Sequence, residues 1–309
     1  MRTSFLMLAL VLLSAAPALA APTYSDIQVA HIDDLGKPFD LKANLYLPPG
    51  PKGSPTPLLL YIHGKGGSYN APKDRLAQLA ESLTGSGIAV ATIDYRQSGR
   101  MPAMLFDTKA YIRYFRAHAG QYNLDPRRFA IWGVSRGGNL AAMLAVTGDV
   151  KTLEGTIGGN TDQSSQLAAC VIYFPLTDMF LNADDKAAQM FSDYLGTSPA
   201  DSAAIVAAYR HHDTASPFWK DVMRIEEVNP LNYVKKDAPP ALIAVGGHDV
   251  GNVPINSSAF YEKYIETGAE AHYYSWSSGT HGHVGKDIED ATLIWVVEHL
   301  SANPPQQYR

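Results

Sequence analysis

The sequence predicts an α/β fold with a mostly parallel central sheet, helices on both faces and a small helical cap insertion. Three observations predict it. Short, continuous apolar runs recur along the chain, as expected of strands that are buried on both faces. Segments with helical spacing separate these runs. Glycine-rich or polar residues follow several of the runs, at the strand ends where sites in such folds lie.

The composition is that of a soluble globular protein. The chain has 309 residues, of which 46% are hydrophobic and 18% charged, and this is enough for a large core. Residues 1–20 have the pattern of a secretory signal peptide, with Arg2, the apolar run Phe5–Leu13 and then Ala18-Leu19-Ala20. This run is too short to span a bilayer. We therefore expect cleavage after Ala20, a secreted or periplasmic protein without a membrane span, and a single domain over residues 21–309.

Charge and cysteine content narrow the function classes further. The net charge of −5 becomes more negative when Arg2 is removed, so nucleic acid is not an expected partner. Cys170 is the single cysteine of the sequence, which excludes an intramolecular disulfide. Because Cys170 lies in an apolar run, we expect it to be buried in a strand.

Strands and helices alternate along the first part of the chain. We expect two antiparallel strands at a sheet edge, a buried strand, a helix that glycines end, a second buried strand and a second helix. These elements cover, in chain order, Ile27–Ile32, Leu41–Leu47, Leu58–Ile62, Lys73–Leu83, Ile88–Ile93 and Leu105–Ala119.

The same alternation continues in the second part, with one interruption. Residues 179–235 mix short helical patterns (Ala187–Tyr194 and Ala203–His212) with scattered charge, which indicates a cap-like insertion over the site. The other expected elements are the strands Ala168–Phe174, Ala241–Val245 and Ala271–Trp276 and the helices Ser257–Thr267 and Val284–Leu300.

The stretch from Phe129 to Met143 carries the main functional signal. An apolar run ends in Gly133-Val134-Ser135-Arg136-Gly137, a G-x-S-x-G pattern, and an Ala-rich helical run follows. This order indicates a strand, a sharp turn and a helix, with glycines where strand and helix approach closely. The turn would expose the Ser135 hydroxyl at a helix N-terminus, where amide dipoles favour negative charge. Ser135 is therefore a candidate nucleophile, and the alternative is an idle serine in a glycine-rich turn.

A serine nucleophile needs a base and an acid, and both are available at later strand ends. Asp249 follows one expected strand and His281 follows the last, and Ser, Asp, His is the chain order of the triad in such folds. Two alternatives stay open: Asp178 also follows a buried strand, and His283 lies in the same loop as His281. No other His, Cys or carboxylate cluster around the pair His211-His212 suggests a metal site, and we expect neither a metal nor a cofactor.

The loop His63–Gly67 is the second strong feature. It follows a buried strand upstream of Ser135, where such a fold supplies an oxyanion-hole amide. We expect the backbone N–H groups of Lys65 and Gly66, together with that of Arg136, to form the hole. A phosphate-binding loop is the alternative, but no Lys-Ser/Thr pair and no ordered G-x-G-x-x-G follows.

With these residues in place, the chain resembles the α/β-hydrolase superfamily, and most of all the small esterases grouped with bifunctional acetyl/feruloyl esterases and hormone-sensitive-lipase-like enzymes. The resemblance covers nearly all of the chain after residue 20. Its motifs are the HGGG-like loop at His63, Asp94-Tyr95-Arg96, Asp125–Phe129, the turn Gly133–Gly138, Asn229–Val234 and His281-Gly282.

The chain departs from the pattern of that family at three points. Lys65 replaces the middle glycine of the oxyanion loop, and Arg136 replaces the usual small residue after the serine. The segment after Asp249 is one residue longer than the usual DxxVP.

These observations predict a secreted serine carboxylic-ester hydrolase that acts on short-chain acyl esters without a cofactor or metal. The resemblance implies acetyl or feruloyl esters of plant polysaccharide, or small esters, as substrates. Two alternatives remain: a serine peptidase of the prolyl-oligopeptidase type, and a catalytically idle binding protein on this fold. The sequence does not indicate the oligomeric state.

Overall fold

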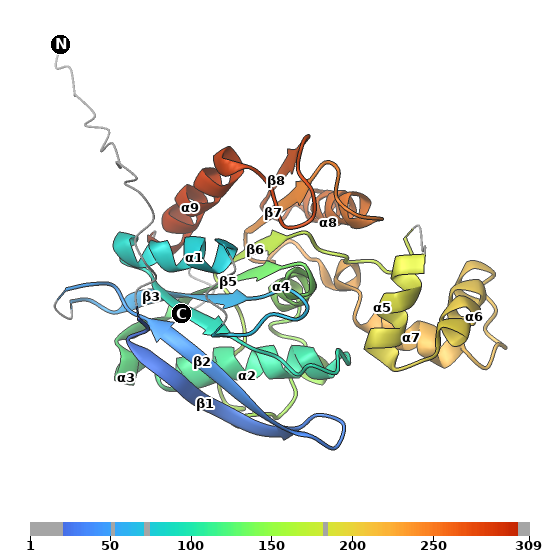
Figure 1. Ribbon diagram of the computed structural model, residues 1–309, viewed down its shortest axis with the longest axis horizontal. Helices are drawn as coiled ribbons and strands as arrows, with labels where there is room; N and C mark the ends of the chain where they lie inside the picture. The colour runs from blue at the N-terminus through green and yellow to red at the C-terminus, as the bar shows by residue number, and fades with distance from the viewer. Residues whose placement is uncertain (1–20, 51–52, 71–74, 182–184, 302–309) are drawn as a thin grey trace, which may run out of the picture.

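The computed structural model describes residues 21–50, 53–70, 75–181 and 185–301. The expected signal peptide, residues 1–20, lies outside the described residues. A twisted sheet of eight strands runs through the middle of the described part, with helices on both of its faces (Figure 1). This architecture confirms the predicted α/β fold class.

The strands and helices largely follow the expected alternation. The strands are β1 (Tyr24–Asp33), β2 (Pro38–Tyr46), β3 (Thr56–Ile62), β4 (Ala89–Ile93), β5 (Leu124–Val134), β6 (Ala169–Tyr173), β7 (Ala241–Gly246) and β8 (Ala271–Trp276). The α-helices are α1 (Arg75–Glu81), α2 (Ala103–Ala117), α3 (Ala119–Tyr122), α4 (Arg136–Val146), α5 (Asp185–Leu195), α6 (Pro199–Arg210), α7 (Trp219–Glu227), α8 (Val253–Thr267) and α9 (Lys286–Ser301). Short 3₁₀ helices cover Ser82–Ser86, Lys151–Leu153 and Pro230–Tyr233.

The sheet has the order β1-β2-β4-β3-β5-β6-β7-β8. Strand β2 pairs antiparallel with both β1 and β4, and all the other neighbours are parallel. The expected antiparallel pair at a sheet edge is thus confirmed. Because β3 and β5 to β8 are parallel, the loops after them meet at one edge of the sheet, and this edge holds every predicted site residue.

The sheet separates two apolar cores. Helices α2, α4 and α8 pack on one face, and α1 and α9 pack on the other (Figure 1). Strand residues such as Leu58 to Ile62 are almost fully buried because neighbouring strand residues point into different cores. Cys170 is fully buried in β6, as expected from its apolar run.

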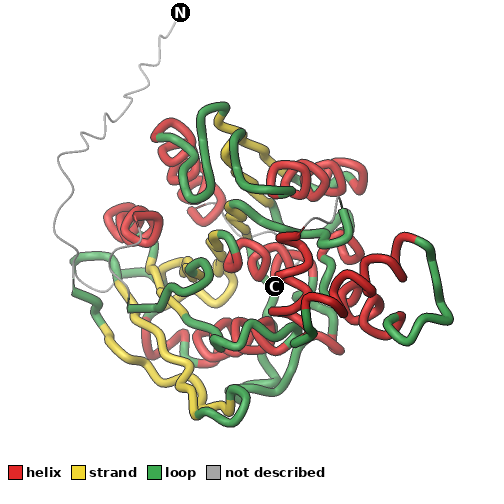
Figure 2. The backbone as a smooth tube through the Cα atoms, turned by 45° about the vertical axis from the view of Figure 1, so that its right-hand side comes forward, coloured by secondary structure: helices red, strands yellow, loops and turns green. Residues whose placement is uncertain are grey.

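Residues 179–235 hold α5, α6 and α7, which pack against one another at one end of the molecule. Figure 2 shows these helices standing apart from the strands. Helix α6 begins with a capping box, in which Ser198 and Asp201 bond to each other's backbone N–H. The sequence did not predict α7, because its apolar face is narrow: Val222 and Ile225 are its only buried apolar residues.

The helix expected over Lys73–Leu83 differs from the structure. Lys73 lies outside the described residues, and the α-helical part ends at Glu81. The chain continues as a 3₁₀ helix to Ser86, after which Gly87 takes a left-handed conformation at a φ of 81°. The N–H of Gly87 bonds the carbonyl groups of Leu83 and Thr84, so this glycine closes the tighter helix.

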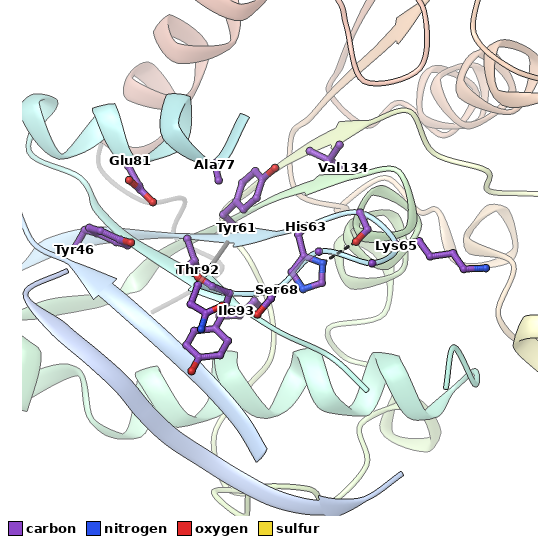
Figure 3. A pocket seen from close by; sticks show the side chains of 15 residues that line it. Tyr46, Tyr61, His63, Lys65, Ser68, Ala77, Glu81, Thr92, Ile93 and Val134 are labelled. Atoms are coloured by element: carbon purple, nitrogen blue, oxygen red, sulfur yellow. Dashed lines mark hydrogen bonds between the residues drawn. The ribbon is translucent and has the colours of Figure 1, made fainter. Parts of the chain in front are cut away.

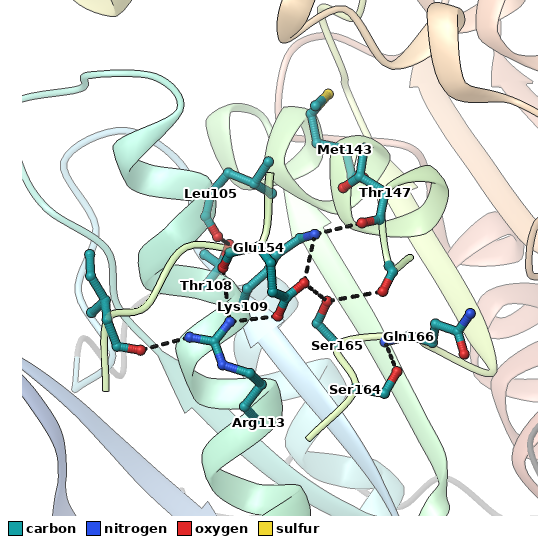
Figure 4. A network of polar contacts seen from close by, with 12 residues as sticks. Leu105, Thr108, Lys109, Arg113, Met143, Thr147, Glu154, Ser164, Ser165 and Gln166 are labelled. Carbon is teal, nitrogen blue, oxygen red and sulfur yellow. Dashed lines mark hydrogen bonds and ion pairs between the residues drawn. The ribbon is translucent and has the colours of Figure 1, made fainter. Parts of the chain in front are cut away.

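A buried polar network joins α2 to residues 147–165 (Figure 4). The side chains of Lys109 and Arg113 are both fully buried, and both contact the carboxylate of Glu154, at 3.2 and 2.6 Å. Lys109 Nζ also donates to the Thr147 carbonyl oxygen, at 2.6 Å. Burial lowers the pKa of Lys109, and the nearby charge of Glu154 opposes this effect. Glu154 therefore balances two cations that water does not reach.

Replacing Glu154 with glutamine should destabilise the protein strongly. Both buried cations would lose their counter-charge, and we expect the free energy of unfolding to fall by about 3 kcal/mol in urea denaturation. Glu266→Gln is the matched control, because Glu266 pairs with Lys263 on the surface at 3.5 Å. The control should cost less than about 1 kcal/mol. Equally small losses in both variants would contradict the role assigned to Glu154.

Candidate active site

Ser135 sits on a strained turn between β5 and α4. Its φ of 57° and ψ of −116° are rare for a residue with a side chain. Two backbone bonds hold it there: its N–H donates to the Tyr173 carbonyl oxygen at 2.9 Å, and its own carbonyl accepts from the Asn139 N–H at 3.0 Å. The turn thus presents the serine side chain at the N-terminus of α4, as the G-x-S-x-G pattern predicts.

Glycines make this turn possible because the backbones around it are in contact. A Cβ on Gly133 would lie 2.0 Å from the Gly137 carbonyl oxygen. A Cβ on Gly137 would lie 2.3 Å from the carbonyl oxygen of Ile62, the last residue of β3. No side chain fits at either position, so β3, β5 and α4 meet only because these residues are glycines.

The structure brings Ser135, Asp249 and His281 together. His281 Nε2 lies 2.8 Å from Ser135 Oγ, and His281 Nδ1 lies 2.8 Å from Asp249 Oδ1. A carboxylate only accepts hydrogen bonds, so Nδ1 carries a proton and a neutral His281 is left to accept the Ser135 hydroxyl proton at Nε2. The Asp249 side chain is fully buried, whereas that of His281 is 35% exposed.

Asp178 and His283, the alternative candidates for the acid and the base, make different contacts. Asp178 Oδ1 accepts from the backbone N–H groups of Phe180 and Leu181, at 2.8 and 3.2 Å, which is the role of a turn residue. The ring of His283 packs against Trp276, with 4.8 Å between ring centroids. Neither residue shares a hydrogen bond with Ser135 or His281 in the described part of the chain.

The loop His63–Gly67 lies beside the serine. A Cβ built on Gly64 would be 3.4 Å from Ser135 Cβ, so a glycine backbone borders the reactive side chain. His63 anchors the start of this loop: it is buried, its Nε2 lies 3.0 Å from Asp94 Oδ1, and its ring stacks on Tyr95. Asp94 and Tyr95 thereby gain a concrete structural role, which their sequence motif alone did not specify.

The side chains of Lys65 and Arg136 both turn to a residue that the sequence analysis missed. Lys65 Nζ donates to Asp193 Oδ2 at 2.8 Å, and Arg136 Nη2 donates to the same oxygen. Asp193 lies near the end of α5, within an ordinary-looking helical pattern. Because no motif marks it, only its position in space reveals the contact.

A cavity of about 290 Å³ lies against the loop His63–Gly67 (Figure 3). Its lining includes Gly64 and Val134, which adjoin Ser135, and aromatic side chains such as Tyr46 and Tyr61. Glu81 also lines it, and burial raises the pKa of this carboxyl. Burial, together with the charge of Glu81, raises the pKa of Tyr46 to about 12. The cavity thus combines aromatic walls with a few polar groups.

The described residues contain neither a candidate metal site nor a candidate membrane helix. Among the described residues, no group of three or more His, Cys, Asp or Glu side chains is placed to hold a metal ion. Within the same residues, no helix is long and apolar enough to cross a membrane.

The fold and the serine turn define an α/β hydrolase, and several known proteins that resemble the chain are named as esterases. The BD-FAE family model matches residues 43–264. The chain therefore belongs to the BD-FAE family, as the resemblance seen in the sequence implied.

Individual relatives are distant. Esterase LipQ of Mycobacterium tuberculosis is 24% identical over 231 residues, which are 74% of this chain and 50% of LipQ. The chain thus spans about half the length of that relative.

Two solved structures share the fold over most of this chain. A truncated carbohydrate esterase from gut microbiota matches with a TM-score of 0.72 and 25% identity, over 93% of this chain and 100% of that one. An acetyl ester-xyloside bifunctional hydrolase from Caldicellulosiruptor lactoaceticus matches with a TM-score of 0.68 and 20% identity, over 89% of this chain and 96% of that one.

Proposed function

We propose that the protein is a serine carboxylic-ester hydrolase whose triad is Ser135, His281 and Asp249. The observation that carries the proposal is the continuous hydrogen-bond chain from Ser135 Oγ through the His281 ring to Asp249 Oδ1, with both distances at 2.8 Å. These two hydrogen bonds link a nucleophile, a base and an acid in the order that acyl transfer requires.

In the proposed reaction, Ser135 Oγ attacks the ester carbonyl carbon while His281 Nε2 takes the hydroxyl proton. The resulting imidazolium is stabilised by Asp249 and returns the proton to the leaving alcohol, so that an acyl-serine and a free alcohol form. Water then attacks the acyl-serine with His281 again as the base. The acid is released, and Ser135 regains its proton.

The tetrahedral intermediates of both steps carry an oxyanion. We propose that the backbone N–H groups of Lys65, Gly66 and Arg136 donate to it. The support is positional: the loop lies beside Ser135, and the N–H of Arg136 belongs to the first turn of α4. One such donor typically contributes about 100-fold or more in rate.

For the substrate, we propose short-chain acyl esters, with acetyl or feruloyl esters of plant polysaccharide as the natural candidates. Membership of the BD-FAE family and the similarity to a carbohydrate esterase support this choice. The cavity beside the loop also supports it, because its volume of about 290 Å³ suits a small or aromatic group better than a long lipid chain.

We propose in addition that the protein is exported, on the basis of the apolar run and Ala18-Leu19-Ala20 near the start of the sequence. Expression in a Gram-negative host should give a mature form in the periplasm or medium whose N-terminal residue, by Edman sequencing or mass spectrometry, is Ala21. An uncleaved protein retained in the cytoplasm would contradict export.

Hydrolysis of p-nitrophenyl esters from acetate to laurate tests the activity directly. We expect turnover to be highest for the shortest chains and to fall toward laurate. Ser135→Ala should lose about a millionfold in kcat, because the nucleophile and its base act as a unit. Activity that survives in this variant would overturn the mechanism. Cleavage of peptide amides but not of esters would favour a peptidase, and no Ser135-dependent turnover of either would favour a binding protein.

The acid of the triad can be tested with a matched pair of variants. Asp249→Asn should lower kcat by about 10⁴-fold, since the amide would favour the wrong tautomer of His281. Asp178→Asn should keep kcat within about tenfold of the wild type, because in the described structure the Asp178 carboxylate accepts only from backbone N–H groups of its own turn. The opposite ranking of the two variants would assign the acid to Asp178.

A further inference from the structure

One carboxylate joins the residues on the two sides of Ser135. Lys65 follows Gly64, which borders the serine, and Arg136 directly follows the serine. The side chains of both residues meet at Asp193 Oδ2, with Lys65 Nζ at 2.8 Å. Lys65 is among the residues that line the cavity, and Figure 3 shows the end of its side chain directed away from the aromatic side chains. Lys65 and Arg136, which both depart from the family pattern, thus contact the same carboxylate, that of Asp193.

Asp193 is itself fixed in place. Arg100 Nη1 donates to the carbonyl oxygens of Ser192 and Asp193, each at 3.0 Å. The next residue, Tyr194, accepts from the Met101 N–H at 3.2 Å through its carbonyl and from Asn139 Nδ2 at 2.9 Å through its hydroxyl. These bonds satisfy carbonyl groups in the last turn of α5 and tie that turn to α4 and to the segment before α2. Asp193 is therefore a rigid anchor that the insertion supplies.

The two ion pairs of the cluster differ in burial: the Lys65 side chain is 60% exposed, so its pair is partly screened by water, whereas the Arg136–Asp193 pair is largely buried. The side chains of Arg136 and Asp193 are only 8% and 19% exposed. Burial alone would raise the pKa of Asp193, but the hydrogen bond from Lys65 and the charges of Arg136 and Lys65 outweigh it and hold this pKa below its ordinary value. Asp193 is thus ionised at neutral pH. Without its charge, two cations would face each other, one of them largely shielded from water.

The loop that carries Lys65 needs such an anchor. Three of the four residues in Gly64-Lys65-Gly66-Gly67 are glycines, which have the greatest backbone freedom to lose when they are ordered. The His63–Asp94 contact holds the start of the loop from the sheet side. The contact between Lys65 and Asp193 holds its middle from the insertion side.

We propose that Asp193 is a positioning residue, which holds Lys65 and Arg136 so that the oxyanion-hole amides on both sides of Ser135 stay aligned. This inference rests on the proposed function. Asp193 touches neither the ester nor the triad in this assignment. It acts by coupling α5 to the oxyanion loop, so that residues 179–235 contribute to the chemical step.

Steady-state kinetics of Asp193→Asn on p-nitrophenyl acetate test the proposal. We expect kcat to fall by about ten- to a hundredfold with little change in KM, because misplaced donors weaken transition-state binding more than ground-state binding. Asp193→Glu keeps the charge and should recover part of kcat. Lys65→Met should also lower kcat. In the double variant Asp193→Asn/Lys65→Met, the fold-loss in kcat should be smaller than the product of the two single fold-losses, because both changes break the same contact.

The control neutralises another carboxylate of the same insertion. Asp201→Asn weakens the capping box of α6 without touching the loop, and kcat should stay at the wild-type level. An unchanged kcat in Asp193→Asn, an equal fall in Asp201→Asn, or losses that multiply in the double variant would each overturn the positioning role. A wild-type protein without Ser135-dependent hydrolysis would overturn the proposed function and this inference with it, so the two failures are distinguishable.

Discussion

The candidate site depends on the close approach of three backbones around Ser135. A Cβ on Gly137 would lie 2.3 Å from the Ile62 carbonyl oxygen, and a Cβ on Gly133 would lie 2.0 Å from the Gly137 carbonyl oxygen. This contact fixes where β3, β5 and α4 meet, and it holds Ser135 at a φ of 57°. A strained conformation persists only where its surroundings over-determine it. The energy stored in the turn is therefore balanced by the large apolar cores on both faces of the sheet.

The two halves of the site come from opposite parts of the chain. The proposed acid and base follow β7 and β8, near the C-terminal end of the described residues, whereas the proposed oxyanion loop follows β3, near the beginning. The insertion adds a third contribution through Asp193. A rigid parallel sheet allows this division because all the strands deliver their loops to one edge. Small shifts at any of the three sources would misalign groups that must act within hydrogen-bond distance.

Much of the fold could be predicted from the sequence, because strands buried on both faces must be continuous apolar runs. Elements with weaker patterns were predicted less well. Helix α7 was missed, since Val222 and Ile225 are its only buried apolar residues and it packs mainly against α5 and α6. The helix before Gly87 was predicted to end at Leu83, whereas its α-helical part ends at Glu81 and a 3₁₀ helix continues to Ser86, because the two kinds of turn leave the same signal in a short segment.

The sequence by itself determined the alternation of strands and helices, the serine turn and the short set of acids and bases at strand ends. These depend on local patterns: apolar periodicity, glycines at crowded positions and chain order. Only the tertiary structure decided which of these residues meet. It placed Asp249 and His281 in hydrogen-bond contact with each other, whereas the Asp178 carboxylate bonds backbone N–H groups of its own turn. It also joined Lys65 and Arg136 to Asp193 across distant segments. A contact between residues far apart in the chain depends on the packing of the whole fold, and no local pattern encodes it.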